Sequence, residues 1–154
     1  MIERRRKKGM NWKVNNSDSK GKISELIFEI LCHQLGLEVA KNLNNIAPYD
    51  YLLNLNGKWL KIQVKTAYKT PTYESLPSRK YKMASHLVLR LFRHSQGYQI
   101  RDGDKVQERR YREGDFDYIF ATTGSEHWLI PFEVVVGKWN INLSCGKYKQ
   151  YKFP

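Results

Sequence analysis

The chain has 154 residues, 41% hydrophobic and 13% aromatic, a composition that favours one folded domain over a disordered chain. No apolar run is long enough to cross a bilayer or to act as a signal core, and Cys32 and Cys145 lack metal-ligand spacing, so we expect a cytoplasmic protein with reduced thiols. The net charge of +12, from 27 basic and 15 acidic residues, predicts a nucleic-acid partner.

The first predicted elements are a basic arm and a helix. The arm covers about residues 1–18, and it could either follow phosphates or remain solvated. The segment 23–36 has apolar residues at helical spacing and ends at Gly36, as helices often do. We expect one buried stripe on this helix, formed by Ile23, Leu26, Ile27, Ile30, Leu31 and Leu35. A short strand is predicted after it, at residues 37–43.

The segment 49–66 is predicted to be a β-hairpin. Asn56-Gly57 is a strong two-residue turn signal, because both positions tolerate a positive φ. That turn pairs residue i with residue 113 − i and places Asp50 opposite Gln63. Period-two alternation then gives a core face formed by Tyr51, Leu53, Leu55, Leu60, Ile62 and Val64.

The other face of this hairpin carries a candidate metal site. Asp50 and Gln63 could offer two oxygens to one hard cation such as Mg²⁺, and Lys65 lies two residues along on the same face. A cation there could bind a phosphate and activate water, and a nearby ammonium could orient that water. The alternative is an ordinary solvent-facing strand, since one Asp, one Gln and two lysines are common on such a face.

The segment 67–85 reads as a long basic loop suited to contacting a polyanion. It holds the candidate DNA-contacting residues Lys69, Arg79, Lys80 and Lys82, which could equally be exposed without a fixed role. Further strands are predicted at 86–93, 116–123 and 127–137, the last interrupted by Pro131, with a second hairpin turning at Asp102-Gly103.

The order of these motifs resembles the core of the PD-(D/E)XK nuclease superfamily, in which a helix glutamate, a hairpin aspartate and an acid-x-lysine build the site. "GKISELIFE", "PYD" and "QVK" carry the resemblance over about residues 20–67. By position, Glu25 matches the helix glutamate, Asp50 the aspartate, Gln63 the acid and Lys65 the lysine. The glutamine variant is similar to that of the small intron-encoded homing endonucleases of cyanobacteria.

The resemblance implies an α/β (α+β) fold with a restriction-endonuclease-like core: a mixed central sheet, a hairpin carrying the site and an N-terminal helix packed on the sheet. It implies a single domain over residues 1–154 that cuts double-stranded DNA with Mg²⁺, or Mn²⁺ in its place, as a homodimer or homotetramer. Asp50, Gln63 and the Val64 carbonyl would hold the metal, with Glu25 contributing directly or through water, and Lys65 would assist the attacking water. Glu29, one helical turn beyond Glu25, is expected to be a supporting or solvent-facing residue.

Two alternatives remain open. The first is a Holliday junction resolvase, or a repair or restriction-type nuclease, with the same core and a different substrate. The second is a DNA- or RNA-binding module without catalysis, which the missing acid at Gln63 and the excess of positive charge both favour.

Overall fold

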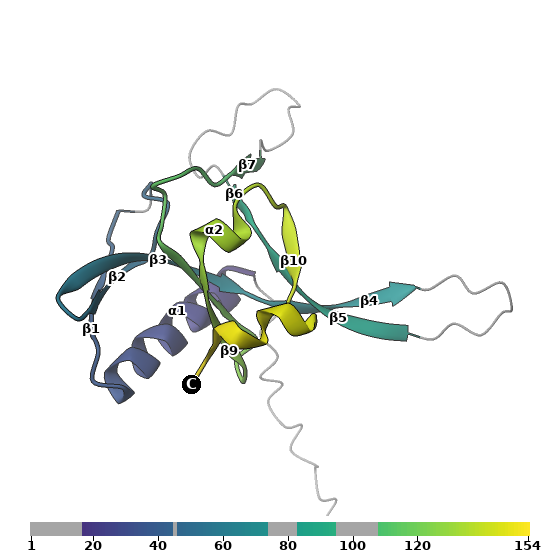
Figure 1. Ribbon diagram of the computed structural model, residues 1–154, viewed down its shortest axis with the longest axis horizontal. Helices are drawn as coiled ribbons and strands as arrows, with labels where there is room; N and C mark the ends of the chain where they lie inside the picture. Colours follow the sequence, from purple (N-terminus) through teal and green to yellow (C-terminus); the bar gives the residue numbers. More distant parts are fainter. Residues whose placement is uncertain (1–16, 45, 74–82, 95–107) are drawn as a thin grey trace, which may run out of the picture.

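The computed structural model describes residues 17–44, 46–73, 83–94 and 108–154 (Figure 1). The predicted basic arm up to residue 16, the turn at Asp102-Gly103 and residues 74–82 therefore lie outside the described residues. The elements are α1 (Ser17–Gln34), β1 (Glu38–Lys41), β2 (Tyr51–Leu55), β3 (Lys58–Thr66), β4 (Tyr68–Tyr73), β5 (Met83–Arg90), β6 (Phe92–His94), β7 (Glu108–Arg110), β8 (Tyr118–Thr122), β9 (His127–Pro131), α2 (Phe132–Val135), β10 (Asn140–Asn142), the 3₁₀ helix η1 (Gly146–Tyr151) and β11 (Lys152–Phe153).

A six-stranded mixed sheet forms the centre of the fold, in the order β1-β2-β3-β8-β9-β11. The β3–β8 pair is parallel and its neighbours in the sheet are antiparallel. A second sheet has the order β10-β5-β4, and β6 pairs with β7. The mixed sheet and the N-terminal helix confirm the predicted α+β fold class.

The hairpin formed by β2 and β3 has the predicted turn and register. Asn56 and Gly57 have φ values of 54° and 82°, both in the left-handed region that this turn requires. Pairs from Leu55–Lys58 to Tyr51–Ile62 follow the expected sum of 113. The predicted core face is also confirmed, except that Leu55, beside the turn, is exposed.

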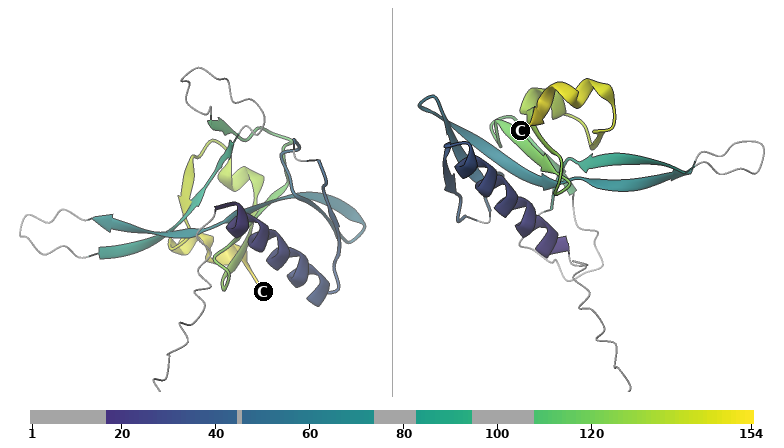
Figure 2. Two further views of the ribbon diagram at one scale, coloured as in Figure 1. Left: turned by 180° about the vertical axis from the view of Figure 1, so that it is seen from behind. Right: turned by 90° about the horizontal axis from the view of Figure 1, so that it is seen from below.

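Helix α1 covers one face of the central sheet, and α2 and η1 lie over the other face (Figure 2). The side of α1 that packs on the sheet matches the predicted stripe only in part: Ile27 and Leu31 are partly buried against the core. Ser24, Phe28 and Cys32 are buried, whereas Ile23, Leu26, Ile30 and Leu35 are exposed. Apolar residues occur around most of this helix, so periodicity alone does not identify the buried side. The buried side is the one that carries Phe28, because the Phe28 ring packs against Tyr51 and Phe120, with ring centroids 5.2 and 4.9 Å away.

The opposite face of the sheet packs against the second sheet. Ile119 and Ala121 of β8 and Trp128 and Ile130 of β9 form this core with Leu87 and Leu89 of β5, Ile141, Leu143 and Tyr148. The segment 67–85, predicted to be a loop, instead contributes β4 and the start of β5, which pair from Tyr68–Val88 to Tyr73–Met83. The loop prediction is wrong for residues 68–73 and 83–85, where Pro71 lies in the ladder opposite Ser85, and residues 74–82 lie outside the described part of the chain.

The predicted strand 127–137 also differs in the structure, because Pro131 ends β9 and the short helix α2 follows. Within the part of the chain that the structure describes, no helix combines the length and the apolar character needed to span a membrane.

Candidate active site

The end of the β2–β3 hairpin opposite its turn brings Asp50 and Gln63 into contact. The regular ladder stops at Tyr51–Ile62, and the backbone N–H of Asp50 donates to the Ile62 carbonyl at 2.8 Å. From this position the Asp50 carboxylate reaches β3. Its Oδ2 accepts hydrogen bonds from Gln63 Nε2 and from the Val64 backbone N–H, both at 2.7 Å. The two side chains are therefore adjacent, as the Asn-Gly turn predicts, although Asp50 and Gln63 are not a backbone pair of the ladder.

The Gln63 amide lies where oxygen atoms from three residues could surround one cation. Its Nε2 donates to Asp50 Oδ2 at 2.7 Å and to the Val64 carbonyl oxygen at 3.1 Å, so the positive end of the amide lies between these two oxygens. Rotating the amide by half a turn exchanges its nitrogen and oxygen and brings a third oxygen to the same place. A carboxylate, a backbone carbonyl and an amide oxygen are ligands that Mg²⁺ accepts. The donor set therefore fits a hard cation.

The Asp50 carboxylate carries an electrostatic cost in this position. Burial raises its pKa from the usual 3.8 to about 6, and the charge of Glu25 acts in the same direction. The hydrogen bond from the Val64 N–H and the charges of Lys65 and Lys41 oppose that rise. A partly buried carboxylate that its neighbours compensate only in part attracts a further cation.

Lys65 supplies an ammonium group on the same face of β3 as Gln63. Its side chain is half-buried, and its Nζ lies 5.6 Å from the centre of the Tyr111 ring. Burial lowers the pKa of Lys65, and the negative charge of Asp50 partly restores it. The predicted grouping of Asp50, Gln63, the Val64 carbonyl and Lys65 is thus present in one place.

Glu25 lies beside this group, but its carboxylate is engaged elsewhere. Ser24, in the N-terminal half of α1, contacts the end of β3, with 2.7 Å between its Oγ and Thr66 Oγ1. Glu25 Oε2 forms an ion pair with Lys41 Nζ at 3.0 Å. Among the described residues, no group of three His, Cys, Asp or Glu side chains could hold a metal ion. A cation at Asp50 would therefore depend on the neutral oxygens of Gln63 and Val64.

Lys41 is a member of the site that the sequence did not predict. It pairs with Tyr51 in the β1–β2 register, and its Nζ lies 5.6 Å from the centre of the Tyr51 ring. The Tyr51 hydroxyl donates to Glu29 Oε2 at 3.1 Å, so Glu29 has the supporting role that was one of its two expected roles. The sequence places Lys41 in a short predicted strand before the hairpin, but that position alone does not indicate a role in the site.

The structure describes one of the four candidate DNA-contacting residues. Lys69 is exposed on β4 and lines a pocket to which neither Asp50 nor Gln63 contributes. Arg79, Lys80 and Lys82 lie outside the described residues.

Comparison with known proteins identifies a fold for this chain but does not assign it to a family. No family model matches the chain, and no curated protein matches it. Among solved structures, the chain is similar to a bacterial homing endonuclease, I-Ssp6803I, with a TM-score of 0.66 and 20% identity. The match covers 89% of this chain and 88% of that chain. At this level of identity the likeness establishes a shared fold, and the function has to be argued from the site.

Proposed function

We propose that this chain is a Mg²⁺-dependent endonuclease that hydrolyses phosphodiester bonds in double-stranded DNA. The observation that carries the proposal is the convergence of Asp50 Oδ2 and the Val64 carbonyl on the Gln63 amide. Lys65 lies on the same face of the strand, close enough for its charge to lower the pKa of Asp50. The net charge of +12 supports a polyanionic substrate.

Each residue has a separate role in this proposal. Asp50, Gln63 through its amide oxygen and the Val64 carbonyl hold the metal, and Glu25 contributes directly or through water after leaving Lys41. Bound Mg²⁺, or Mn²⁺ in its place, would neutralise charge on the scissile phosphate and lower the pKa of water. Lys65 orients the attacking water and stabilises the charge that builds on the phosphate. Its partial burial strengthens both effects, because fewer water molecules screen the ammonium.

We also propose that the enzyme is of the site-specific homing type and that it uses a PD-(D/E)XK site in a glutamine variant. Two observations support this assignment: the fold shared with a homing endonuclease and the order of Glu25, Asp50, Gln63 and Lys65 along the chain. Cutting both strands requires two active sites and the described residues offer one, so we infer an even-numbered homo-oligomer, a dimer or a tetramer. We place the protein in the cytoplasm, with reduced thiols.

The test is cleavage of supercoiled plasmid and of long linear duplex with and without Mg²⁺. The wild type should nick or linearise DNA only with the metal. Lys65→Met should lower the rate by about 100-fold or more while DNA binding persists. Lys58→Met is the matched control, because Lys58 is exposed on the same strand beside the turn. Wild-type cleavage by Lys65→Met would overturn the proposal, and preferential cleavage of a four-way junction would replace homing with junction resolution.

A second candidate function is DNA or RNA binding without catalysis. The missing acid at Gln63 and the ion pair that engages Glu25 with Lys41 both favour it. This alternative predicts salt-sensitive binding that needs no divalent ion. It also predicts no nicking at any concentration of Mg²⁺ or Mn²⁺, so the plasmid experiment separates the two functions.

A further inference from the structure

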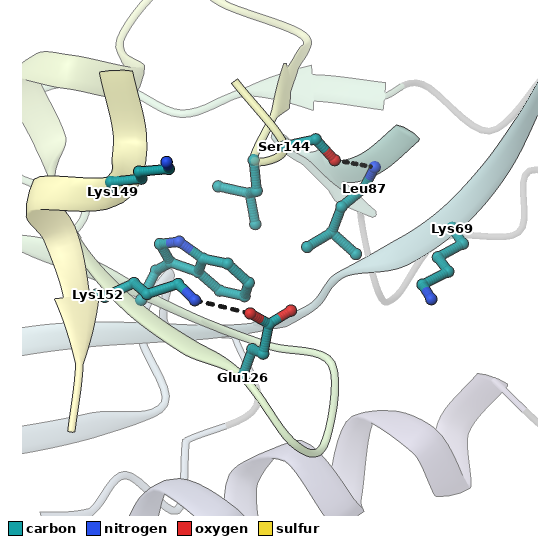
Figure 3. A pocket seen from close by; sticks show the side chains of 8 residues that line it. Lys69, Leu87, Glu126, Ser144, Lys149 and Lys152 are labelled. Atoms are coloured by element: carbon teal, nitrogen blue, oxygen red, sulfur yellow. Dashed lines mark hydrogen bonds and ion pairs between the residues drawn. The ribbon is translucent and has the colours of Figure 1, made fainter. Parts of the chain in front are cut away.

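A pocket of about 240 Å³ lies away from the Asp50 site, where the central sheet meets the second sheet (Figure 3). Lys69 of β4, Lys149 of η1 and Lys152 of β11 line it. Its apolar lining includes Trp128 and Leu143, both almost fully buried. The three lysines come from three separate elements, so the pocket depends on the tertiary fold and not on a local run of charge.

The charges of the pocket are unbalanced. Glu126 is its acidic residue, and Glu126 Oε1 pairs with Lys152 Nζ at 2.7 Å. Figure 3 shows the Glu126 carboxylate between Lys152 and Lys69, with Lys149 on the Lys152 side. The hydrogen bond from Lys152, followed by the charges of Lys152 and Lys69, lowers the pKa of Glu126. Three lysines and one glutamate line the pocket, so it has an excess of positive charge.

The register of the central sheet relates this pocket to the candidate active site. Lys65 pairs with Ala121, Ala121 with Trp128, and Trp128 with Lys152. Directly paired residues point to the same face, so Lys65 and the pocket residues Trp128 and Lys152 belong to one row across the sheet. Three steps of about 4.8 Å separate the backbones of β3 and β11, which gives about 14 Å. The two places therefore lie within the width of a DNA duplex, while Ala121 and Trp128 between them are buried under the second sheet.

We propose that this lysine pocket binds a phosphate group of the DNA backbone outside the cleavage site. The proposal rests on the proposed DNA-directed function, and it assigns binding, not chemistry, to the pocket. Lysine ammonium groups are compact charges that suit phosphate oxygens. Glu126 competes with the phosphate for Lys152, so it weakens binding in the wild-type protein.

The experiment measures the affinity for a fluorescein-labelled mixed-sequence DNA duplex by anisotropy, in EDTA, across a series of salt concentrations. Removing one phosphate contact should reduce the slope of log K against log salt by about 0.9 and weaken binding about five- to tenfold near 0.1 M salt. Lys149→Gln and Lys69→Gln should each show this loss, and Glu126→Gln should bind more tightly than the wild type. Lys147→Gln is the matched control, because Lys147 is exposed on the same 3₁₀ helix and does not line the pocket.

Each outcome has a definite meaning. If Lys147→Gln and Lys149→Gln lose equal DNA affinity, the loss reflects the overall positive charge and not the pocket, and the proposal is overturned. If titration with inorganic phosphate shows binding that depends on Lys149 while the DNA slope is unchanged, the pocket serves a free phosphate compound and the DNA assignment is wrong. Plasmid cleavage distinguishes the failure of one proposal from the failure of the other. If the wild type cuts plasmid and the pocket variants bind DNA as tightly as the wild type, only the pocket proposal is refuted.

Discussion

The Gln63 side chain donates a hydrogen bond to the Asp50 carboxylate, with 2.7 Å between Nε2 and Oδ2. The N–H group of the amide thus interacts with the carboxylate where a bound divalent cation would otherwise do so. The same nitrogen lies 3.1 Å from the Val64 carbonyl oxygen. Binding a cation therefore requires the amide to rotate, and the hydrogen bonds it gives up reduce the net affinity for metal.

Asp50→Asn should abolish cleavage and stabilise the metal-free protein. Burial raises the pKa of Asp50 from 3.8 to about 6, so above pH 6 the folded state holds a charge that it disfavours. This pKa difference corresponds to a loss of at most about 3 kcal/mol in folding free energy, and the neutral asparagine avoids that loss. The asparagine side-chain oxygen can still accept the hydrogen bond from the Val64 N–H. Thermal unfolding at pH 8 in EDTA measures the effect, and Glu113→Gln, an exposed carboxylate, is the control. A lower melting temperature in Asp50→Asn would contradict the electrostatic cost assigned to this carboxylate.

Gln63→Glu should destabilise the metal-free protein and strengthen its response to Mg²⁺. The substitution removes the N–H donor from Asp50 and brings a second carboxylate beside it, which should cost about 1–3 kcal/mol. Two acids at one point also bind a divalent cation more tightly than one acid with an amide. Thermal unfolding in EDTA and in Mg²⁺ gives both quantities. Gln34→Glu makes the same chemical change at an exposed position at the end of α1, and an equal Mg²⁺ response there would refute a specific site at Gln63.

Much of this site could be predicted because its geometry is local. The Asn56-Gly57 turn sets the register of the hairpin, and the register brings Asp50 next to Gln63 within one short segment. The involvement of Lys41 could not be predicted in this way, because it depends on how β1 pairs with β2. Pairing between separate strands is decided by the packing of the whole sheet, and a single sequence contains no local signal for it.

The buried side of α1 shows the same limit. Ile23, Leu26 and Ile30 have the helical spacing of a buried stripe, yet they are 42%, 54% and 54% exposed. Phe28 and Cys32 are fully buried on another side of the helix, where Tyr51 and Phe120 fill the space beneath them. When apolar residues surround a helix, the shape of the opposing sheet decides which of them are covered.

The two cysteines should differ strongly in reactivity. Cys32 is buried and Cys145 is exposed. Burial, with a smaller contribution from the charge of Glu29, raises the pKa of Cys32 to about 11, which leaves about one thiolate in a thousand at pH 8. Iodoacetamide should add once to the native protein, at Cys145, and twice in urea, as mass spectrometry can show. Cys145→Ser should then remain unlabelled in the native state, and rapid labelling of this variant would show that Cys32 is accessible.

His127 should make the folded protein less stable at mildly acidic pH. Its Nδ1 lies 2.9 Å from Thr122 Oγ1, and its ring stacks on Phe120 with centroids 5.7 Å apart. Burial lowers the pKa of His127 below its usual 6.5, while the charge of Glu126 opposes the change. The unfolded chain therefore takes up a proton more readily than the folded protein, and stability falls as the pH drops below about 6.5.

Asp50 titrates in the same range with the opposite sign, because a raised pKa makes the folded state the better proton acceptor. The wild-type profile alone therefore cannot isolate His127. The informative quantity is the difference in unfolding free energy between the wild type and His127→Gln, measured by urea titration from about pH 8 to about pH 5. The wild type should lose stability relative to the variant as the pH falls. His33→Gln, at an exposed position near the end of α1, is the control, and parallel profiles for wild type and His127→Gln would refute the role of His127.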